Sequence, residues 1–516
     1  MSVTLGRELV GAGLRSREDV DLRLDASREA ANGHEVDRAA PTRLPSRITR
    51  VAVIVPAFLT AGTFLQPPIG ALLAAARLRA IGIDCALIDN RVKRLTVRAL
   101  AAHLADCDLV CVITTPYDHI QNYFVDYRLR HAFAVARALR KRCPSTPLVV
   151  AGAHGTVRPD LVFQETDADF VLRGEVDTTL AMFCDAISSG SEAPPEVVFR
   201  GTAVAAPAAD GAVPGHRLVD LSPRFRTRRI DDDGLLPAYD LVDLADYYGD
   251  RYVGAIPHRQ YHWATVLAAR GCAFSCDFCF NFWGRSTRRR DPEAVVAELL
   301  WLVGDHGARS VFFLDFNFTE NRRWIFDLCR AIRRAPVTRW YAQTRCDLVD
   351  DEMLREMRAA GCEGLWFGVE SFDPDVAGRM SKYGDVGMAD RALATCLDAG
   401  IKPHIFIMIG SPGETRHSLD RTIGLMHRWK AAYCGVMPAV PRFGTPFYAQ
   451  AKSQFPALGT DFYGLRAVRG LVGNELRPTD LQDALSILTD RRFIDASVAP
   501  RLFDVGGPHQ LQGAEL

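Results

Sequence analysis

The residues best suited to chemistry in this 516-residue chain are three closely spaced cysteines, Cys272, Cys276 and Cys279. An apolar run at 265–269 comes directly before them, which predicts a strand that ends where the cysteine loop begins. Thiolates from so short a loop can converge on one site, and soft thiolates favour zinc or an iron–sulfur cluster over hard cations. With 13 cysteines in the whole chain, this spacing is improbable by chance.

The alternatives to a cluster are a structural zinc site and a set of buried free thiols. A structural zinc ion takes four protein ligands, and the nearest histidines, His262 and His306, lack zinc-finger spacing. Three cysteines on a cubane leave one iron open to another ligand, and an open position is typical of a reactive metal site. The pattern therefore favours a [4Fe-4S] cluster over zinc or free thiols.

The stretch from Arg270 to Phe280 resembles the CxxxCxxC loop of the radical S-adenosylmethionine (SAM) enzymes. This resemblance implies that the open iron takes the amino and carboxylate groups of SAM. It also implies that the ring of Phe278 packs on the adenine of SAM.

Alternating strand and helix patterns follow the cysteine loop. Five further strands are predicted at 311–315, 340–344, 365–369, 404–409 and 435–440. Helices are predicted at 292–304, 321–334, 351–360 and 415–430. Six βα units fall short of the eight that close a full barrel, so we expect a partial (β/α)6 barrel, the core that radical SAM enzymes have.

Polar residues follow successive strands of this predicted barrel, where the chemistry of βα barrels takes place. An arginine suits the SAM carboxylate, and carboxylates suit its amine or ribose. For any one of these residues, the alternative is an ordinary polar residue in a loop. Resemblance implies SAM contacts for Arg345, Glu370 with Ser371, and the turn that ends at Glu414. The predicted SAM-binding residues are Phe278, Asp315, Gln343, Arg345, Glu370, Ser371, Gly410 and Glu414.

The arginine run Arg288-Arg289-Arg290 could contact a phosphate or a carboxylate. A solvated run of charges is the favoured interpretation.

The first half of the chain also alternates strands and helices. Apolar strands are predicted at 51–55, 85–89, 109–113, 148–151 and 170–172. Strands separated by helices indicate an α/β fold with a parallel, doubly wound, Rossmann-like sheet, whose ligands bind at the carboxyl ends of the strands.

Small or turn-forming residues follow these strands, either as ordinary turns or to let a ligand approach the backbone. The pattern from Pro67-Pro68 through Ala151-Gly152-Ala153-His154 to Arg173-Gly174-Glu175 resembles the cobalamin-binding domain of class B radical SAM enzymes. That resemblance implies that five residues flank the cobalamin nucleotide tail. These are Thr114, Thr115, Gly152, Ala153 and Gly174.

One motif of other cobalamin proteins is absent. Where Asp-x-His-x-x-Gly supplies a histidine to cobalt, this chain reads Asp89-Asn90-Arg91. Many class B members lack the motif too, so bound cobalt is expected to have no histidine ligand. A domain that had lost cobalamin would show the same departure.

The expected organisation has five parts. They are a mobile extension (1–48), the cobalamin-binding domain (49–190), a linker (191–258), the radical SAM barrel (259–450) and a C-terminal cap (451–516).

Composition restricts the partners. Lys plus Arg and Asp plus Glu are equal at 62 each, so no net field attracts nucleic acid or anionic lipid. No apolar stretch has the length of a signal peptide or a membrane span. An odd number of scattered cysteines suits reduced thiols. We therefore expect a cytoplasmic protein without a membrane or nucleic-acid partner.

Together, these resemblances imply a cobalamin-dependent radical SAM methyltransferase that acts on an unactivated carbon of a small molecule. A 5′-deoxyadenosyl radical and methylcobalamin would carry the chemistry, and flavodoxin or ferredoxin would supply electrons, so no side chain is assigned as catalytic. Two alternatives are open: a non-methylating cobalamin enzyme that cyclises or contracts rings, and a cobalamin-free radical SAM isomerase or dehydratase.

Overall fold

A computed structural model describes most of the chain from residue 44 to residue 456 and a few later residues. The described residues are 44–57, 66–115, 126–191, 197–199, 236–247, 252–253, 256–257, 263–281, 283–335, 339–383, 385, 387–429, 433–456, 458, 475–477, 479–481 and 483–484. Most of the predicted extension, linker and C-terminal cap lies outside these residues.

The chain divides into two compact units. Unit 1 comprises Met1–Thr63, Pro68–Ala206 and Leu235–Val242, and unit 2 comprises Phe64–Pro67, Pro207–Gly234 and Asp243–Leu516. Each unit holds one six-stranded sheet.

The sheet of unit 1 has the strand order β2-β1-β3-β4-β5-β6. Its strands are β1 (Arg50–Val55), β2 (Asp84–Asp89), β3 (Leu109–Ile113), β4 (Leu148–Ala151), β5 (Phe170–Leu172) and β6 (Val197–Phe199). The first five are parallel, which confirms the predicted doubly wound α/β fold. The order reverses between β1 and β3, and ligands of such sheets bind beside this point.

The sheet is not wholly parallel, because β6 pairs antiparallel with β5. This strand falls inside the span predicted as a linker. Three residues are too few for periodicity to reveal, and the open edge of β5 supplies the hydrogen bonds that order them.

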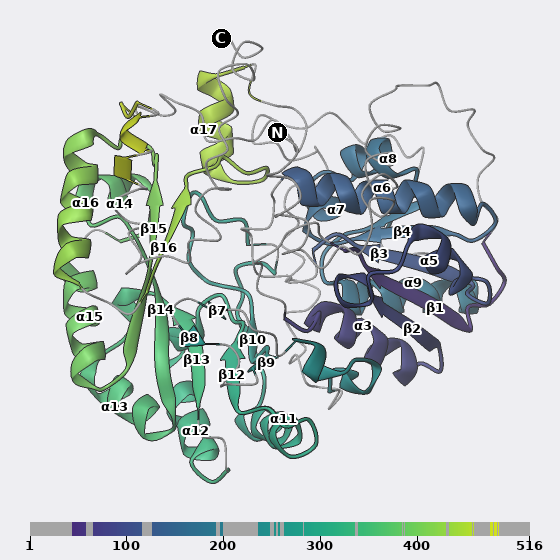
Figure 1. Ribbon diagram of the computed structural model, residues 1–516, viewed down its shortest axis with the longest axis horizontal. Helices are drawn as coiled ribbons and strands as arrows, with labels where there is room; N and C mark the ends of the chain where they lie inside the picture. Colours follow the sequence, from purple (N-terminus) through teal and green to yellow (C-terminus); the bar gives the residue numbers. More distant parts are fainter. Residues whose placement is uncertain are drawn as a thin grey trace, which may run out of the picture. The chain divides into compact units, whose positions relative to one another are not determined.

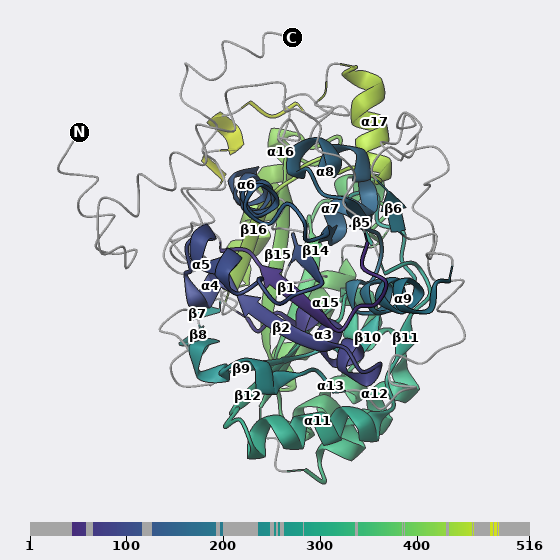
Figure 2. The same ribbon diagram turned by 90° about the vertical axis from the view of Figure 1, so that its right-hand side faces the viewer.

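Helices cover both faces of this sheet. They are α3 (Ile69–Ala80), α4 (Asn90–Lys93), α5 (Val97–Ala102), α6 (Asp126–Arg142), α7 (Ala153–Val157), α8 (Pro159–Thr166) and α9 (Val176–Ser189). α3 packs on α9 and α5 packs on α6, and Figure 2 shows α9 and α5 on opposite sides of β1. Residues 51 to 55 of β1 are all fully buried, as expected for a parallel sheet covered on both faces.

The sheet of unit 2 has the order β16-β15-β14-β13-β12-β9, and every neighbouring pair is parallel. Its strands are β9 (Trp263–Val266), β12 (Ser310–Phe313), β13 (Trp340–Thr344), β14 (Cys362–Glu370), β15 (Lys402–Ile409) and β16 (Tyr433–Pro438). This curled sheet confirms the predicted partial barrel of six strands.

Five helices lie along the outer side of the curled sheet (Figure 1). They are α11 (Pro292–Gly304), α12 (Arg322–Ile332), α13 (Asp351–Ala359), α15 (Gly387–Asp398) and α16 (Arg416–Arg428). The remaining elements of unit 2 are η3 (Leu244–Tyr247), β7 (Tyr252–Val253), β8 (Ile256–Pro257), β10 (Ala269–Arg270), β11 (Arg288–Arg289), η5 (Phe318–Glu320), η6 (Cys346–Leu348), α14 (Pro374–Arg379) and α17 (Pro446–Gln454), and η2 (Tyr239–Leu241) belongs to unit 1. No described helix is long and apolar enough to cross a membrane.

Capping residues explain where these outer helices begin. Asp291 accepts a hydrogen bond from the Glu293 amide at 3.0 Å, and Pro292 occupies the first helical position of α11. Thr415 and Ser418 form a reciprocal capping box at the start of α16. The segments before these caps run from the carboxyl ends of β9 and β15, where the candidate site lies.

Candidate functional site

The cysteine loop lies between β10 and β11, which pair as an antiparallel hairpin. The Asn281 side chain ties the loop together, donating to the carbonyls of Cys272 at 3.0 Å and Gly284 at 2.6 Å. Gly271 has φ +93°, and a Cβ there would lie 2.3 Å from the Ser286 carbonyl oxygen. The loop therefore needs glycine where it leaves β10.

The three thiols of the loop are sheltered and influence one another. Cys276 is buried, whereas Cys272 and Cys279 are partly buried. Burial raises the pKa of Cys272 to about 12, and the nearby Cys279, Glu320 and Cys276 also raise it. A thiol in these surroundings stays protonated unless a metal takes the place of its proton.

The arrangement fits a cluster better than a single metal ion. Among the described residues, no three His, Cys, Asp or Glu side chains converge as ligands of one ion. Cysteines on a cubane bind different irons, so their sulfurs need not meet at a point. The donors in the loop are all sulfur, the ligand type that iron–sulfur clusters take. Cys272, Cys276 and Cys279 together therefore suit a [4Fe-4S] cluster.

The arginine run is not a solvated run of charges, which corrects the favoured interpretation from sequence. Arg288 and Arg290 are buried, and Arg290 pairs with the fully buried Glu298. Arg289 forms an ion pair with Glu320 at 3.3 Å. Glu320 also accepts from the Thr287 hydroxyl at 2.7 Å, so the run anchors β11 beside the cysteine loop.

Arg345 follows β13 and reaches the cysteine loop. Its Nη1 donates to the Cys276 sulfur at 3.4 Å. Its Nε and Nη2 donate to the two carboxylate oxygens of Asp347, at 2.9 and 2.7 Å. The guanidinium also lies 4.0 Å from the centre of the Phe274 ring.

An ion pair joins the partly buried Glu370, at the end of β14, to the buried Lys382. Lys382 Nζ lies 3.3 Å from Glu370 Oε1 and 5.9 Å from the centre of the Phe278 ring. Burial acts to lower the pKa of Lys382, but Glu370 and the Cys276 sulfur outweigh it and leave this pKa raised. The ammonium therefore stays charged close to the cysteine loop.

The backbone at Glu370 is unusual. β14 and β15 slip in register here, because Gly368 pairs with Phe406 whereas Glu370 pairs with Ile407, leaving Val369 as an extra residue. Glu370 has φ +66°, which is rare for a residue with a side chain. Such strain costs about 1–3 kcal/mol and clusters at functional sites.

The turn after β15 is closed by its own acidic residue. Glu414 accepts hydrogen bonds from the amides of Gly410 at 2.5 Å and Ser411 at 3.1 Å. Burial raises the pKa of Glu414 to about 7, despite these two donors. Gly410 has φ +79°, so the turn needs glycine at its first position.

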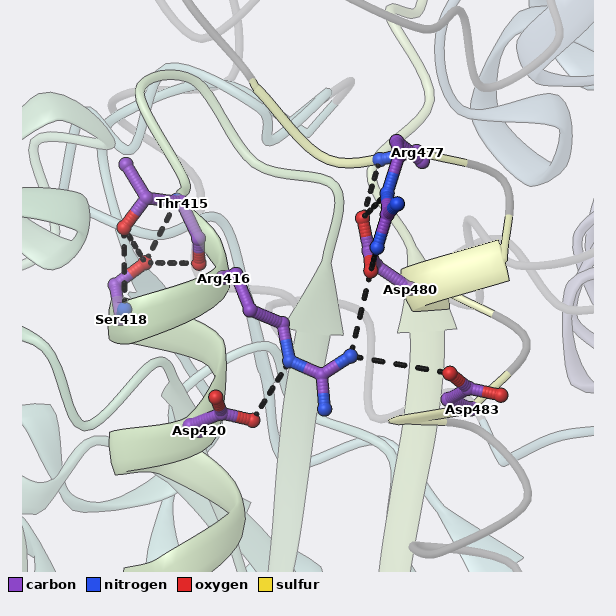
Figure 3. A network of polar contacts seen from close by, with 7 residues as sticks. All are labelled: Thr415, Arg416, Ser418, Asp420, Arg477, Asp480 and Asp483. Carbon is purple, nitrogen blue, oxygen red and sulfur yellow. Dashed lines mark hydrogen bonds and ion pairs between the residues drawn. The ribbon is translucent and has the colours of Figure 1, made fainter.

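A C-terminal segment is fastened beside this turn (Figure 3). The Glu475 amide donates to the Glu414 carbonyl at 3.0 Å. Asp480 accepts from Arg477 at 2.9 Å and from Arg416 at 3.3 Å, and Arg416 begins α16. The pKa of Asp480 is held well below its usual range, mainly by hydrogen bonds from Arg477. Asp480 therefore links this segment to the start of α16.

Three other predicted SAM residues make contacts within the barrel. Asp315 is buried and accepts from the Ala268 amide at 3.1 Å, and burial raises its pKa to about 7. The Gln343 amide donates to the Asp315 carbonyl at 2.8 Å. The Ser371 hydroxyl accepts from the Asp373 amide at 3.1 Å, which places it at the start of α14. Their binding of SAM stays a prediction.

In unit 1, two threonines after β3 meet the glycine turn after β4. The Ala153 amide donates to Thr115 Oγ1 at 3.1 Å, and Thr114 Oγ1 lies 3.2 Å from the Ala151 carbonyl. Gly152 has φ +121°, and a Cβ there would lie 2.6 Å from Thr115 Oγ1 and 2.8 Å from Thr114 Oγ1. The Gly174 amide completes the cluster by donating to Thr156 Oγ1 at 2.9 Å.

A closed ion pair occupies the end of β2. Arg91 donates to both carboxylate oxygens of Asp89, at 2.8 and 2.5 Å, and both side chains are buried. The segment therefore offers a guanidinium, and no imidazole, where the absent cobalt-binding motif would have its histidine.

Sequence reasoning did not identify three residues that shape the site in unit 2: Lys382, Asn281 and Glu320. Lys382 follows α14 in a stretch without periodicity, so its only sequence signal is its charge. Asn281 and Glu320 act on the backbone and on β11, and such contacts leave no pattern in the sequence.

Comparisons with known proteins agree with this geometry. Residues 266–426 match the model of the Radical SAM superfamily. An uncharacterized methyltransferase of Pyrococcus horikoshii is 26% identical over 75% of this chain and 78% of its own length. An anaerobic magnesium-protoporphyrin IX monomethyl ester cyclase of Rubrivivax gelatinosus is 26% identical over 74% and 66%. A tryptophan 2-C-methyltransferase of Streptomyces laurentii is 25% identical over 45% and 39%.

Solved structures share the fold. A radical SAM methyltransferase from Kitasatospora setae, solved with cobalamin and a [4Fe-4S] cluster, has a TM-score of 0.63 and 19% identity, covering 79% of this chain and 75% of its own. A cobalamin-dependent SAM radical enzyme solved with aqua-cobalamin has a TM-score of 0.58 and 14% identity, covering 76% and 54%.

Proposed function

Because the chain belongs to the cobalamin-dependent radical SAM family that contains methyltransferases, we propose that it methylates an unactivated carbon of a small molecule. The observation that carries the proposal is the sheltered loop of Cys272, Cys276 and Cys279 at the carboxyl end of a six-stranded partial barrel. When bound, the cluster and cobalamin supply the reductive cleavage of SAM to a 5′-deoxyadenosyl radical and the methyl group that is transferred.

The residues around the loop can bind and orient SAM. Lys382 supplies a buried cation for its carboxylate, and Glu370 supplies an anion for its amine or ribose. Phe278 is partly exposed beside them and offers a ring for adenine. The turn from Gly410 to Glu414, which its own hydrogen bond holds in shape, adds backbone groups to this site. Because the fold holds these charged groups in place before SAM binds, the entropic cost of orienting SAM is lower.

In unit 1, the residues at the strand ends can take the cobalamin tail. Gly174 has positive φ and no side chain, so a ligand can approach the backbone closely there. Thr114 and Thr115 hold the Gly152 turn in shape through their hydroxyls. With Arg91 paired to Asp89, this segment would give cobalt no histidine ligand.

Two further features belong to the proposal. A reduced one-electron carrier such as flavodoxin or ferredoxin would supply the electron, and the cytoplasm would keep the thiols reduced.

Oxidative cyclisation is the second candidate, because the cyclase of Rubrivivax gelatinosus aligns with 74% of this chain. Both reactions would use the same cluster and the same SAM residues. They differ in whether a methyl group leaves SAM.

The test uses full-length protein purified without oxygen and loaded with iron, sulfide and cobalamin. After gel filtration we expect about four irons and one cobalamin to remain bound. With methyl-labelled SAM and reductant, we expect label on cobalamin and formation of S-adenosylhomocysteine. Protein that retains the cluster but no cobalamin would refute methylation and favour the cobalamin-free alternative. Bound cobalamin that never takes up the label would favour cyclisation.

A further inference from the structure

Arg345 makes a contact that the binding of SAM does not require. Its Nη1 donates to the Cys276 sulfur at 3.4 Å, joining residues 69 positions apart in the chain. Cys276 is the most deeply buried of the three candidate cluster ligands, with 7% of its surface exposed. The contact therefore lies where solvent competes little with a hydrogen bond.

The remaining contacts of Arg345 fix its guanidinium. Nε and Nη2 form a bidentate pair with Asp347, and Nη2 also donates to the Lys382 carbonyl. The Phe274 ring lies against the guanidinium at 4.0 Å. To bind a carboxylate of SAM bidentately, Arg345 would have to give up its pair with Asp347. The geometry holds it on the sulfur instead.

We propose that Arg345 is a positioning residue that raises the reduction potential of the cluster through its hydrogen bond to Cys276. The proposal rests on the proposed function, because it requires that the loop bind the cluster. In the step concerned, one electron passes from a one-electron donor protein to the cluster, and no proton moves. The thiolate sulfurs share the added negative charge, so a cationic donor stabilises the reduced state more than the oxidised state.

Asp347 should act in the opposite direction. Its carboxylate contacts Nε and Nη2 of the guanidinium, whereas the sulfur contacts Nη1, and it offsets part of the positive charge. Loss of Arg345 and loss of Asp347 should therefore move the potential with opposite signs. If the two substitutions only loosened the loop, their shifts of the reduction potential would not have opposite signs.

The experiment measures the midpoint potential of the full-length protein by redox titration followed with electron paramagnetic resonance. Arg345→Gln should reduce the equilibrium constant for cluster reduction about tenfold, a fall of ~59 mV for a one-electron couple. Asp347→Asn should raise the potential. The control is Arg333→Gln, whose ion pair with Glu356 links α12 and α13 and is about one-third exposed. It should leave the potential unchanged.

Iron content is measured first in every protein. Wild-type protein without about four irons would refute the proposed function itself. If the cluster assembles, equal potentials in wild type and both variants, or shifts in one direction, overturn the role of Arg345. If Arg345→Gln retains no iron, Asp347→Asn decides: a raised potential supports the inference, and an unchanged or lowered potential overturns it.

Discussion

Replacement of Gly152 by alanine should destabilise unit 1 through two separate costs. The first is backbone strain, because φ +121° and ψ −177° lie in a region that only glycine adopts readily. Strain of this kind costs about 1–3 kcal/mol. The second is a steric conflict, because the new Cβ would lie 2.6 Å from Thr115 Oγ1 and 2.8 Å from Thr114 Oγ1.

The conflict should displace the Thr115 hydroxyl from the Ala153 amide, a hydrogen bond worth about 1 kcal/mol. We therefore expect Gly152→Ala to lower the free energy of unfolding by about 2–4 kcal/mol. Gly190 is a matched control in the same unit, since it has φ +69° and a Cβ added there would meet nothing within 4 Å. Gly190→Ala should cost about 1–2 kcal/mol, the backbone part alone.

Hydrogen exchange of the β3 and β4 amides is the suitable assay, because it reports on unit 1 without assuming that the whole chain unfolds in one step. The same variant should lose bound cobalamin while it keeps iron. If Gly152→Ala were no more destabilising than Gly190→Ala, the contact between the threonines and the turn would not constrain this position.

Four further predictions concern unit 2. Cys272→Ala should abolish cluster assembly whereas Cys329→Ala, which removes a buried thiol of α12, should leave it intact, as iron and sulfide analysis will show. Glu370→Gln should weaken SAM binding by about 1.5–3 kcal/mol without loss of iron, measured by equilibrium dialysis. Burial raises the pKa of Glu414 from 4.5 to about 7, so the folded state holds this proton more tightly than the unfolded state does. As the pH rises from 4.5 to 8, the free energy of unfolding of wild type should therefore fall by about 3 kcal/mol. Urea unfolding of Glu414→Gln should show no such fall. Because hydrogen bonds from Arg477 and Arg416 lower the pKa of Asp480, these contacts should persist at neutral pH and break in acid. At pH 7, Asp480→Asn should speed hydrogen exchange of the Glu475 amide, which donates to the Glu414 carbonyl.

The sequence predicts the two sheets well because their strands are apolar runs separated by amphipathic helices. The number of strands in the partial barrel follows from that alternation. It fails for β6, where residues 197–199 become a strand only because the edge of β5 is open.

The contacts of individual side chains could not be predicted in the same way. Arg345 is visible in the sequence as a cation after a strand, but its partners are set by Asp347 and by a cysteine 69 residues earlier. The buried arginine run shows the same limit, because the carboxylates that neutralise it, Glu298 and Glu320, come from other elements. Composition describes charge, whereas burial of charge depends on tertiary neighbours.

The slip in register between β14 and β15 has a consequence for how this part of the chain can evolve. Val369 is an extra residue relative to β15, and it sets where Glu370 leaves the strand. If one residue were deleted, the strands would come back into step, and the carboxylate would shift along the sheet away from Lys382. A substitution at one of these positions changes the contacts of that residue alone. A change of length displaces every residue from Glu370 to the start of α14 at once, so lineages that keep this site should vary in residue type here far more than in residue number.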